Sequence, residues 1–333
     1  NENQSAGGGA IWSLETDVTI TDTSLDSNEA LGSGGAIAAE RGSLAVTNST
    51  FENNRALANG GSIHSSALDT RISNSRFEYN ESSGGYGGAI ALQSVETLIH
   101  RLFAGDNWAR KGGAIYVEAA ESVGETQLFL QNSIAQENES LFGGGALCSG
   151  DDVNLFIHNN NFVANSTLTS GTGSQLQLNS YGADIRSNII VWGENGAAIA
   201  VGIDAASSLL FRHNNLYEND DDFVGLSPLP ESDDGNISAD PSFVDLSLDR
   251  DFTNDDLHLR PGSPCLGTGD PEIAGPSWIE ADIGALGLGE ILPADVDGDG
   301  YSPDFGEDCN DFDPSIYLDA EEICDDGVDN NCD

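Results

Sequence analysis

Apolar residues recur at nearly constant intervals along the first two thirds of the chain. Anchor positions, of which the first four are 26 residues apart, are Leu25, Phe51, Phe77, Phe103, Ile134, Phe162, Ile190 and Leu216. Five residues before each anchor stands a second apolar residue, in the order Ile20, Val46, Ile72, Leu98, Phe129, Ile157, Ile185 and Phe211. The residue after this second position is polar in most repeats, as in Thr21, Thr47 and Ser73. This alternation indicates strands with one buried face, and its repetition predicts eight turns stacked in register.

Glycine and asparagine occupy fixed places in the same repeat. A Gly-Gly-small-aliphatic motif begins at Gly8, Gly34, Gly60, Gly87, Gly112 and Gly144, and an Asn follows most anchors by three or four residues. Glycine permits sharp turns, and we expect Asn132, Asn160, Asn188 and Asn214 to stack their amides from turn to turn. A period in the twenties fits a leucine-rich repeat or a parallel β-helix. Because the dense leucine pattern is missing, the sequence predicts an all-β solenoid over residues 1–220.

The Gly-Gly-Ala-Ile and Phe-x-x-Asn motifs resemble the repeats of chlamydial polymorphic membrane proteins and related bacterial β-helix surface proteins. The resemblance covers about residues 1–220 and implies a right-handed parallel β-helix that is secreted or exposed on the cell surface. Further motifs, such as Asp240-Pro241-Ser242-Phe243 and Gly262-Ser263-Pro264-Cys265, are similar to the closing segment of bacterial proteins termed choice-of-anchor Q. That similarity implies that residues 221–290 form the last irregular turns and a cap.

The end of the chain carries spaced acidic residues. Residues 295–301 place aspartates at alternate positions before a glycine and a tyrosine, which is the oxygen-ligand pattern of a calcium loop. A second set follows, and the last residues repeat the spacing and then stop, so we expect the natural protein to continue. The candidate metal ligands are Asp295, Asp297, Asp299, Tyr301, Asp308, Asn310, Asp311, Asp313, Asp329, Asn331 and Asp333.

We expect residues 291–333 to form an Asp/Cys-rich tail. Within it, residues 295–333 resemble a bacterial Asp/Cys module that is described as a metal-binding motif and is related by name to a methanotroph copper-binding surface protein. The same residues are similar to thrombospondin type 3 calcium repeats. We expect calcium rather than copper, because the ligands are oxygens without clustered His or Met. The alternative is an acidic flexible linker, but spaced Asp-Gly loops are more specific than a run of charge.

The five cysteines are unevenly placed. Cys324 and Cys332 bracket a short loop and are candidates for one disulfide, and Cys309 and Cys265 are candidates for a second. The sequence alone leaves their connectivity open. Cys148 follows Gly-Ala-Leu and is expected to be a lone core residue. A disulfide in a small acidic tail would fit an oxidising, extracellular location.

Charge narrows the range of partners. The chain has 333 residues and a formal net charge of −45, which argues against nucleic acid and anionic membranes and favours cations. A merely solvated acidic surface is the competing explanation. No apolar run approaches the length of a membrane-spanning helix.

A short basic stripe breaks the acidic pattern. His158, Arg186 and Arg212 each lie four residues before an anchor, on the predicted outer face, where they form a candidate glycan-binding site. Because such solenoids host polysaccharide lyases and glycoside hydrolases, an enzyme is the alternative function. The sequence favours a secreted or cell-surface structural or adhesive protein, stabilised by calcium and able to assemble with copies of itself into a filament. Its expected partners are calcium ions, other copies and cell-surface glycans.

Overall fold

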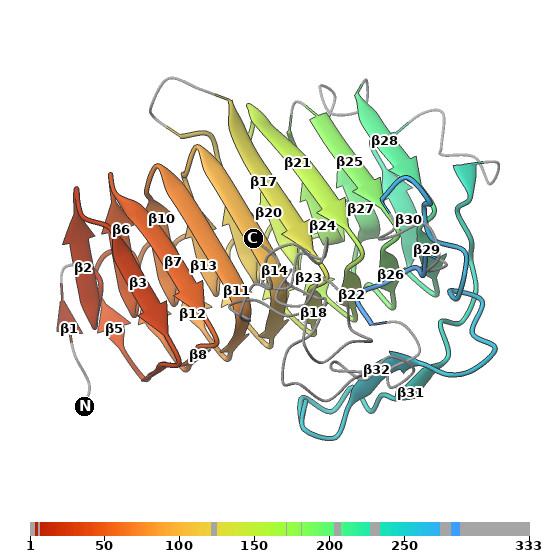
Figure 1. Ribbon diagram of the computed structural model, residues 1–333, viewed down its shortest axis with the longest axis horizontal. Coiled ribbons are helices and arrows are strands. Elements are labelled where there is room, and N and C mark those ends of the chain that lie inside the picture. Colours follow the sequence, from red (N-terminus) through yellow and green to blue (C-terminus); the bar gives the residue numbers. More distant parts are fainter. Residues whose placement is uncertain are drawn as a thin grey trace, which may run out of the picture. The chain divides into compact units, whose positions relative to one another are not determined.

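The computed structural model describes residues 4–5, 7–120, 125–170, 172–180, 182–202, 208–226, 234–273 and 281–286. Contacts divide the chain into two compact units, Asn1–Gly287 and Leu288–Asp333, and all described residues belong to the first. This unit is a parallel β-helix built from stacked coils (Figure 1). The described residues contain no α-helix, and therefore none that is long and apolar enough to cross a membrane.

Three parallel sheets, here called A, B and C, run along the β-helix and are built from successive coils. Sheet A has seven two-residue strands: β1 (Gln4–Ser5), β5 (Glu29–Ala30), β9 (Arg55–Ala56), β12 (Glu81–Ser82), β15 (Trp108–Ala109), β19 (Glu139–Ser140) and β23 (Ser166–Thr167). Sheet B has nine strands: β2 (Ile11–Leu14), β6 (Ile37–Glu40), β10 (Ile63–Ser66), β13 (Ile90–Leu92), β16 (Ile115–Val117), β20 (Leu147–Ser149), β24 (Gly173–Leu178), β27 (Ala197–Val201) and β30 (Asp221–Val224).

Sheet C is the largest and has two columns of strands. The first column is β3 (Val18–Thr21), β7 (Ser43–Thr47), β17 (Thr126–Gln131), β21 (Val153–His158), β25 (Gly182–Arg186) and β28 (Leu209–Arg212). The second is β4 (Ser24–Asp26), β8 (Thr50–Glu52), β18 (Ile134–Gln136), β22 (Asn161–Val163), β26 (Ile189–Val191) and β29 (Asn215–Tyr217). Two longer strands, β11 (Asp69–Glu78) and β14 (Glu96–Gly105), belong to both columns. The two columns therefore form one continuous sheet.

The interior consists of apolar columns, as the sequence predicts. Ile20, Val46 and Ile72 pair directly with one another on β3, β7 and β11. The next member is Ile99 rather than Leu98, and the column continues through Leu130, Ile157, Ile185 and Phe211. All eight side chains are buried.

The prediction for four residues is wrong by one position. Leu98, Phe129, Phe103 and Ile134 are outward-facing, and Ala104 and Ala135 occupy the interior places assigned to the last two. The reason is one extra residue in the coil that contains β14: Ile99 lies 27 residues after Ile72, where a constant period of 26 requires Leu98. The outward Phe129 ring stacks on Phe156, with ring centroids 4.6 Å apart.

Buried asparagines bind each coil to the next. Six of the Asn residues that follow the anchors form one amide ladder, in which each Nδ2 donates to the next Oδ1 at 2.8–3.1 Å: Asn28, Asn54, Asn80, Asn107, Asn138 and Asn165. The expected stack before the anchors joins Asn160, Asn188 and Asn214. Asn132 is not a member, because Ser133 takes its place and donates its backbone N–H to Asn160 Oδ1 at 2.9 Å.

The Gly-Gly motif lies where neighbouring coils are in close contact. In the first five pairs, the second glycine donates its N–H to the carbonyl oxygen of the first glycine of the next coil, as Gly35 does to Gly60 at 3.1 Å. In the sixth pair, Gly145 donates to Ser174 O at 2.7 Å. A Cβ on Gly61 would overlap the Gly88 carbonyl oxygen and the Glu81 backbone. Glycine is therefore required by space in this turn.

The chain beyond β30 returns along the outside of the β-helix. The antiparallel pair β31 (Phe243–Asp245) and β32 (Asp256–Leu259) places Phe243 and Leu259 in an apolar cluster with Val163, Ile189 and Val191 of sheet C. Phe252 packs on Phe103 with ring centroids 5.2 Å apart. The described part of the predicted cap thus covers a side of the β-helix, and its role in closing the end stays a prediction.

Replacing Gly61 by Ala should lower the free energy of unfolding by about 3 kcal/mol or more, because the methyl group meets backbone that cannot move aside. Gly7→Ala is the matched control, since its Cβ would meet only the Ser33 carbonyl oxygen, at 3.6 Å. Denaturant midpoints of the two variants test this. Equal midpoints would contradict the tight packing.

Asn107→Ala should destabilise the protein by about 2–4 kcal/mol, because it leaves buried amide groups without partners. The Asn107 side chain accepts from Asn80 and donates to Phe77 O and Asn138 Oδ1, at 2.8–3.0 Å. Asn154→Ala on the outer face is the control, because its one side-chain hydrogen bond is 3.4 Å long. Thermal unfolding of both variants measures the difference, which would vanish if the ladder were energetically neutral.

Candidate functional site

The three residues of the predicted basic stripe lie side by side. His158, Arg186 and Arg212 occupy paired positions at the ends of β21, β25 and β28. They follow Thr21, Thr47 and Ser73 in one outward column of sheet C, as the polar positions in the sequence predict. The stripe is therefore a feature of the folded surface.

Asp184, which lies on β25 together with Arg186, binds two residues of this stripe. Arg186 Nε lies 2.5 Å from Asp184 Oδ1 and its Nη2 lies 2.6 Å from Oδ2, which is a two-point contact. His158 Nε2 is 3.4 Å from Asp184 Oδ1. Burial raises the pKa of Asp184, but the interactions with His158 and Arg186 outweigh it and bring that pKa to about 2.

The returning segment supplies two more acidic groups. Asp270 Oδ2 lies 3.2 Å from Arg212 Nη2 and 3.5 Å from Arg186 Nη1. Glu272 Oε2 approaches the same two nitrogens at 2.7 and 3.2 Å. The Asp270 side chain is 2% exposed and that of Glu272 is 64% exposed. Nothing in the repeat pattern indicated these partners, because Asp270 follows Arg186 by 84 residues.

The arrangement holds the returning segment on the β-helix. The hydrogen bond to Asp184 is the largest cause of a raised pKa at Arg186, followed by the opposing effect of burial. Both guanidinium groups are occupied by carboxylates of the chain itself, so an acidic sugar would have to displace the exposed Glu272. Glycan binding by His158, Arg186 and Arg212 stays a prediction.

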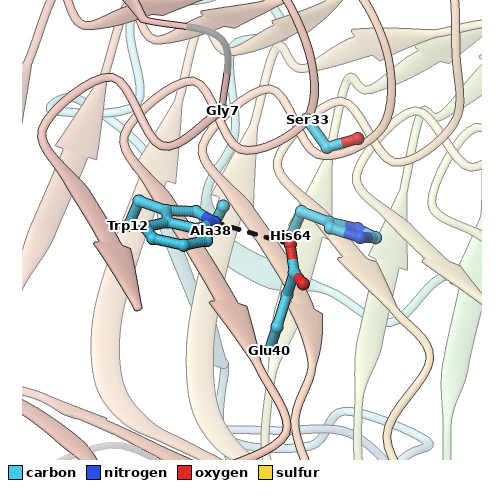
Figure 2. A pocket seen from close by; sticks show the side chains of 6 residues that line it. All are labelled: Gly7, Trp12, Ser33, Ala38, Glu40 and His64. Atoms are coloured by element: carbon cyan, nitrogen blue, oxygen red, sulfur yellow. Dashed lines mark hydrogen bonds between the residues drawn. The ribbon is translucent and has the colours of Figure 1, made fainter. Parts of the chain in front are cut away.

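A hollow of about 560 Å³ lies elsewhere on the surface, over the first coils of sheet B. It is lined by Gly7, Trp12, Ser33, Ala38, Glu40 and His64. Figure 2 shows the Glu40 side chain between the rings of Trp12 and His64, and the indole Nε1 donates to Glu40 Oε1 at 3.5 Å. Positions 12, 38 and 64 repeat the period of 26, so the repeat itself could have identified this column, although the apolar anchors did not point to it.

The candidate metal ligands from Asp295 to Asp333 lie outside the described residues, as do Cys309, Cys324 and Cys332. Within the described ranges, no group of three or more His, Cys, Asp or Glu side chains is placed to hold a metal ion. The tail calcium site and the disulfide pairs therefore stay predictions.

The two described cysteines are both buried, and neither has a disulfide partner in the described part of the chain. Burial raises the pKa of Cys148 to about 12 and that of Cys265 to about 11. Asn215 Nδ2 donates to Cys265 Sγ at 3.2 Å. Cys148 is thus the isolated buried thiol that the sequence predicts.

Two family models match parts of the chain. Residues 308–333 match Cu-binding_MopE, whose description is "Putative metal-binding motif". Residues 48–66 match the Chlamydia polymorphic membrane protein repeat, and cover β8, β9 and β10. Comparison with curated proteins and with solved structures gave no match. With the parallel β-helix, the two short matches fit a β-helix protein of the surface class that carries a metal-binding motif.

Asp184→Asn should lower stability at pH 7 by about 1–3 kcal/mol, because Arg186 loses a partly buried ionic partner. The folded pKa of about 2 lies below the value of about 3.9 for an unfolded Asp. This contribution is therefore complete above about pH 4 and is lost as the pH falls toward 2.

Unfolding of the native chain and of Asp184→Asn, measured from pH 7 to pH 2, tests this prediction. The stability difference should shrink between pH 4 and 2. Asp151→Asn is the control, since Asp151 is exposed. A difference that stays constant over the whole range would contradict the assignment.

Proposed function

We propose that this chain is an extracellular structural and adhesive module of a cell surface, with a calcium-loaded tail. The observation that carries the proposal is the coil-to-coil pairing of sheets A, B and C together with the internal amide ladders. Each coil is held by its neighbours, so the β-helix is a stiff support for exposed side chains. The two family matches support the same class of protein.

We propose a separate role for each of three segments. Residues 1–220 form the stiff support, residues 221–290 cover its flank and close it, and residues 291–333 bind calcium. In the tail, Asp295, Asp297 and Asp299 would supply carboxylate oxygens, which suit calcium better than copper. Bound cations would also offset part of the net charge of −45. Metal binding would then couple to ordering of the tail.

We also propose that copies associate end to end. Strand β30 (Asp221–Val224) pairs with β27 on one side and has no second strand beside it among the described residues. Such a strand offers unpaired backbone groups to a further strand. Repeated contacts of this kind generate a filament.

The lyase alternative is less well supported. In a lyase built on the basic stripe, an Arg would act as the catalytic base, and such a base must be deprotonated near the working pH. Contact with Asp184, Asp270 and Glu272 shifts the pKa of Arg186 upward, away from that range. This geometry favours a structural role for the stripe.

Calcium and copper titrations of the complete, chelator-treated chain test the metal assignment. Calcium should bind with a Kd in roughly the micromolar to millimolar range. The double substitution Asp297→Asn and Asp299→Asn should weaken it by about tenfold or more, because two carboxylate ligands are lost. The control changes Asp151 and Asp152 to Asn. Binding of copper without calcium would contradict the calcium assignment.

Sedimentation and electron microscopy of the complete chain, with and without chelator, test assembly. We expect assemblies with calcium that dissociate when it is removed. A monomer under both conditions would contradict end-to-end association.

A further inference from the structure

The hollow on sheet B has a definite origin in the stacking of the coils. Trp12, Ala38 and His64 are paired, outward-facing residues of β2, β6 and β10. Successive coils are about 4.8 Å apart, so the Trp12 and His64 rings stand ~10 Å apart. The Ala38 methyl group lies beneath the gap, and the Glu40 side chain reaches between the rings. The small Ala38 side chain therefore forms the floor, and the first three coils bound the hollow on its inner side.

The walls combine one apolar face with a few polar groups. Trp12 is 56% exposed, which is unusual for so large an apolar side chain. Across the floor, burial lowers the pKa of His64, an effect that Glu40 partly opposes, so its imidazole is neutral at pH 7. The Nδ1 atom of His64 is buried and has no hydrogen-bond partner among the residues that the structure describes. Ser33 and Glu40 add a hydroxyl and a carboxylate at the rim.

We propose that this hollow is a binding site for a neutral pyranose sugar, with Trp12 as the stacking surface and Glu40, His64 and Ser33 as partners for its hydroxyl groups. A pyranose ring has an apolar C–H face that packs on an aromatic ring, and its hydroxyls both donate and accept. This matches a wall that offers a carboxylate acceptor and a neutral imidazole. The volume of about 560 Å³ lies within the usual size of small-ligand sites.

Charge decides which class of sugar the hollow accepts. Glu40 is the only charged residue among the six that line it, and no Lys or Arg does so. An acidic sugar would meet a carboxylate in a strongly acidic protein, whereas a neutral sugar loses nothing. The hollow therefore differs in specificity from the basic stripe, the candidate glycan-binding site whose cationic groups would favour an acidic sugar.

This assignment deepens the proposed adhesive role and rests on it for the biological source of the sugar. It does not depend on the calcium tail or on assembly. A failed calcium titration would leave it standing, and its own failure would leave the calcium proposal standing.

Calorimetric titration of the complete chain with cellohexaose, a neutral β-linked glucose oligomer, tests the site, and hexagalacturonate serves as the acidic comparison. We expect cellohexaose to bind and hexagalacturonate not to compete. Trp12→Ala should weaken cellohexaose binding by about tenfold or more, because the stacking surface is lost. Ala38→Phe should weaken it similarly by filling the floor, while leaving every proposed ligand contact group in place.

Leu31→Ala is the matched control, because Leu31 is an equally exposed apolar residue, 59% accessible, that does not line the hollow. It should bind cellohexaose like the native chain. Circular dichroism and thermal unfolding establish that the variants are folded. Absence of cellohexaose binding by the native chain would overturn the proposal, as would equal binding by native, Trp12→Ala and Ala38→Phe proteins. Preferential binding of hexagalacturonate would also overturn it and favour the basic stripe.

Discussion

The structure depends on the backbone hydrogen bonds that join each coil to the next. They fix one coil about 4.8 Å above another, so side chains at paired strand positions lie over one another in neighbouring coils. Within that spacing, Gly61 has no room for a Cβ, and Asn80 can exchange hydrogen bonds with both Asn54 and Asn107. Glycine and asparagine therefore recur in the sequence because this spacing requires them at the same place in successive coils.

Outward-facing positions are free to vary, and their variation makes the surface features. The column that holds Trp12, Ala38 and His64 gives a hollow because a small residue stands between two large ones. The column that ends in His158, Arg186 and Arg212 gives a cationic strip because three successive coils place basic groups there. Such a strip can bind a segment that is distant in sequence through ion pairs, and Asp270 and Glu272 of the returning segment form such ion pairs with it.

Most of the fold could be predicted from the sequence, because strand alternation and a constant period are local signals. The register of Ile20, Val46 and Ile72 comes directly from counting residues. Counting failed at Leu98 and Phe129, where one inserted residue moved the next strand by one place and so to the opposite face. The partners of Arg186 were beyond prediction, since contact with Asp270 depends on how the returning segment folds and on no repeat.

Gly105 makes room on the surface of the β-helix for the segment that returns along it. It lies in the outward position between Glu78 and Gln136, and a Cβ there would overlap the ring of Phe252. In the same region, the Tyr79 hydroxyl donates a hydrogen bond to Arg250 O at 2.9 Å, and the two residues are 171 positions apart in the sequence. Coils can add one by one through contacts much closer in sequence than this. The returning segment therefore needs the coils beneath it to be in place before it can dock, because its contacts lie much farther apart in sequence than those between neighbouring coils.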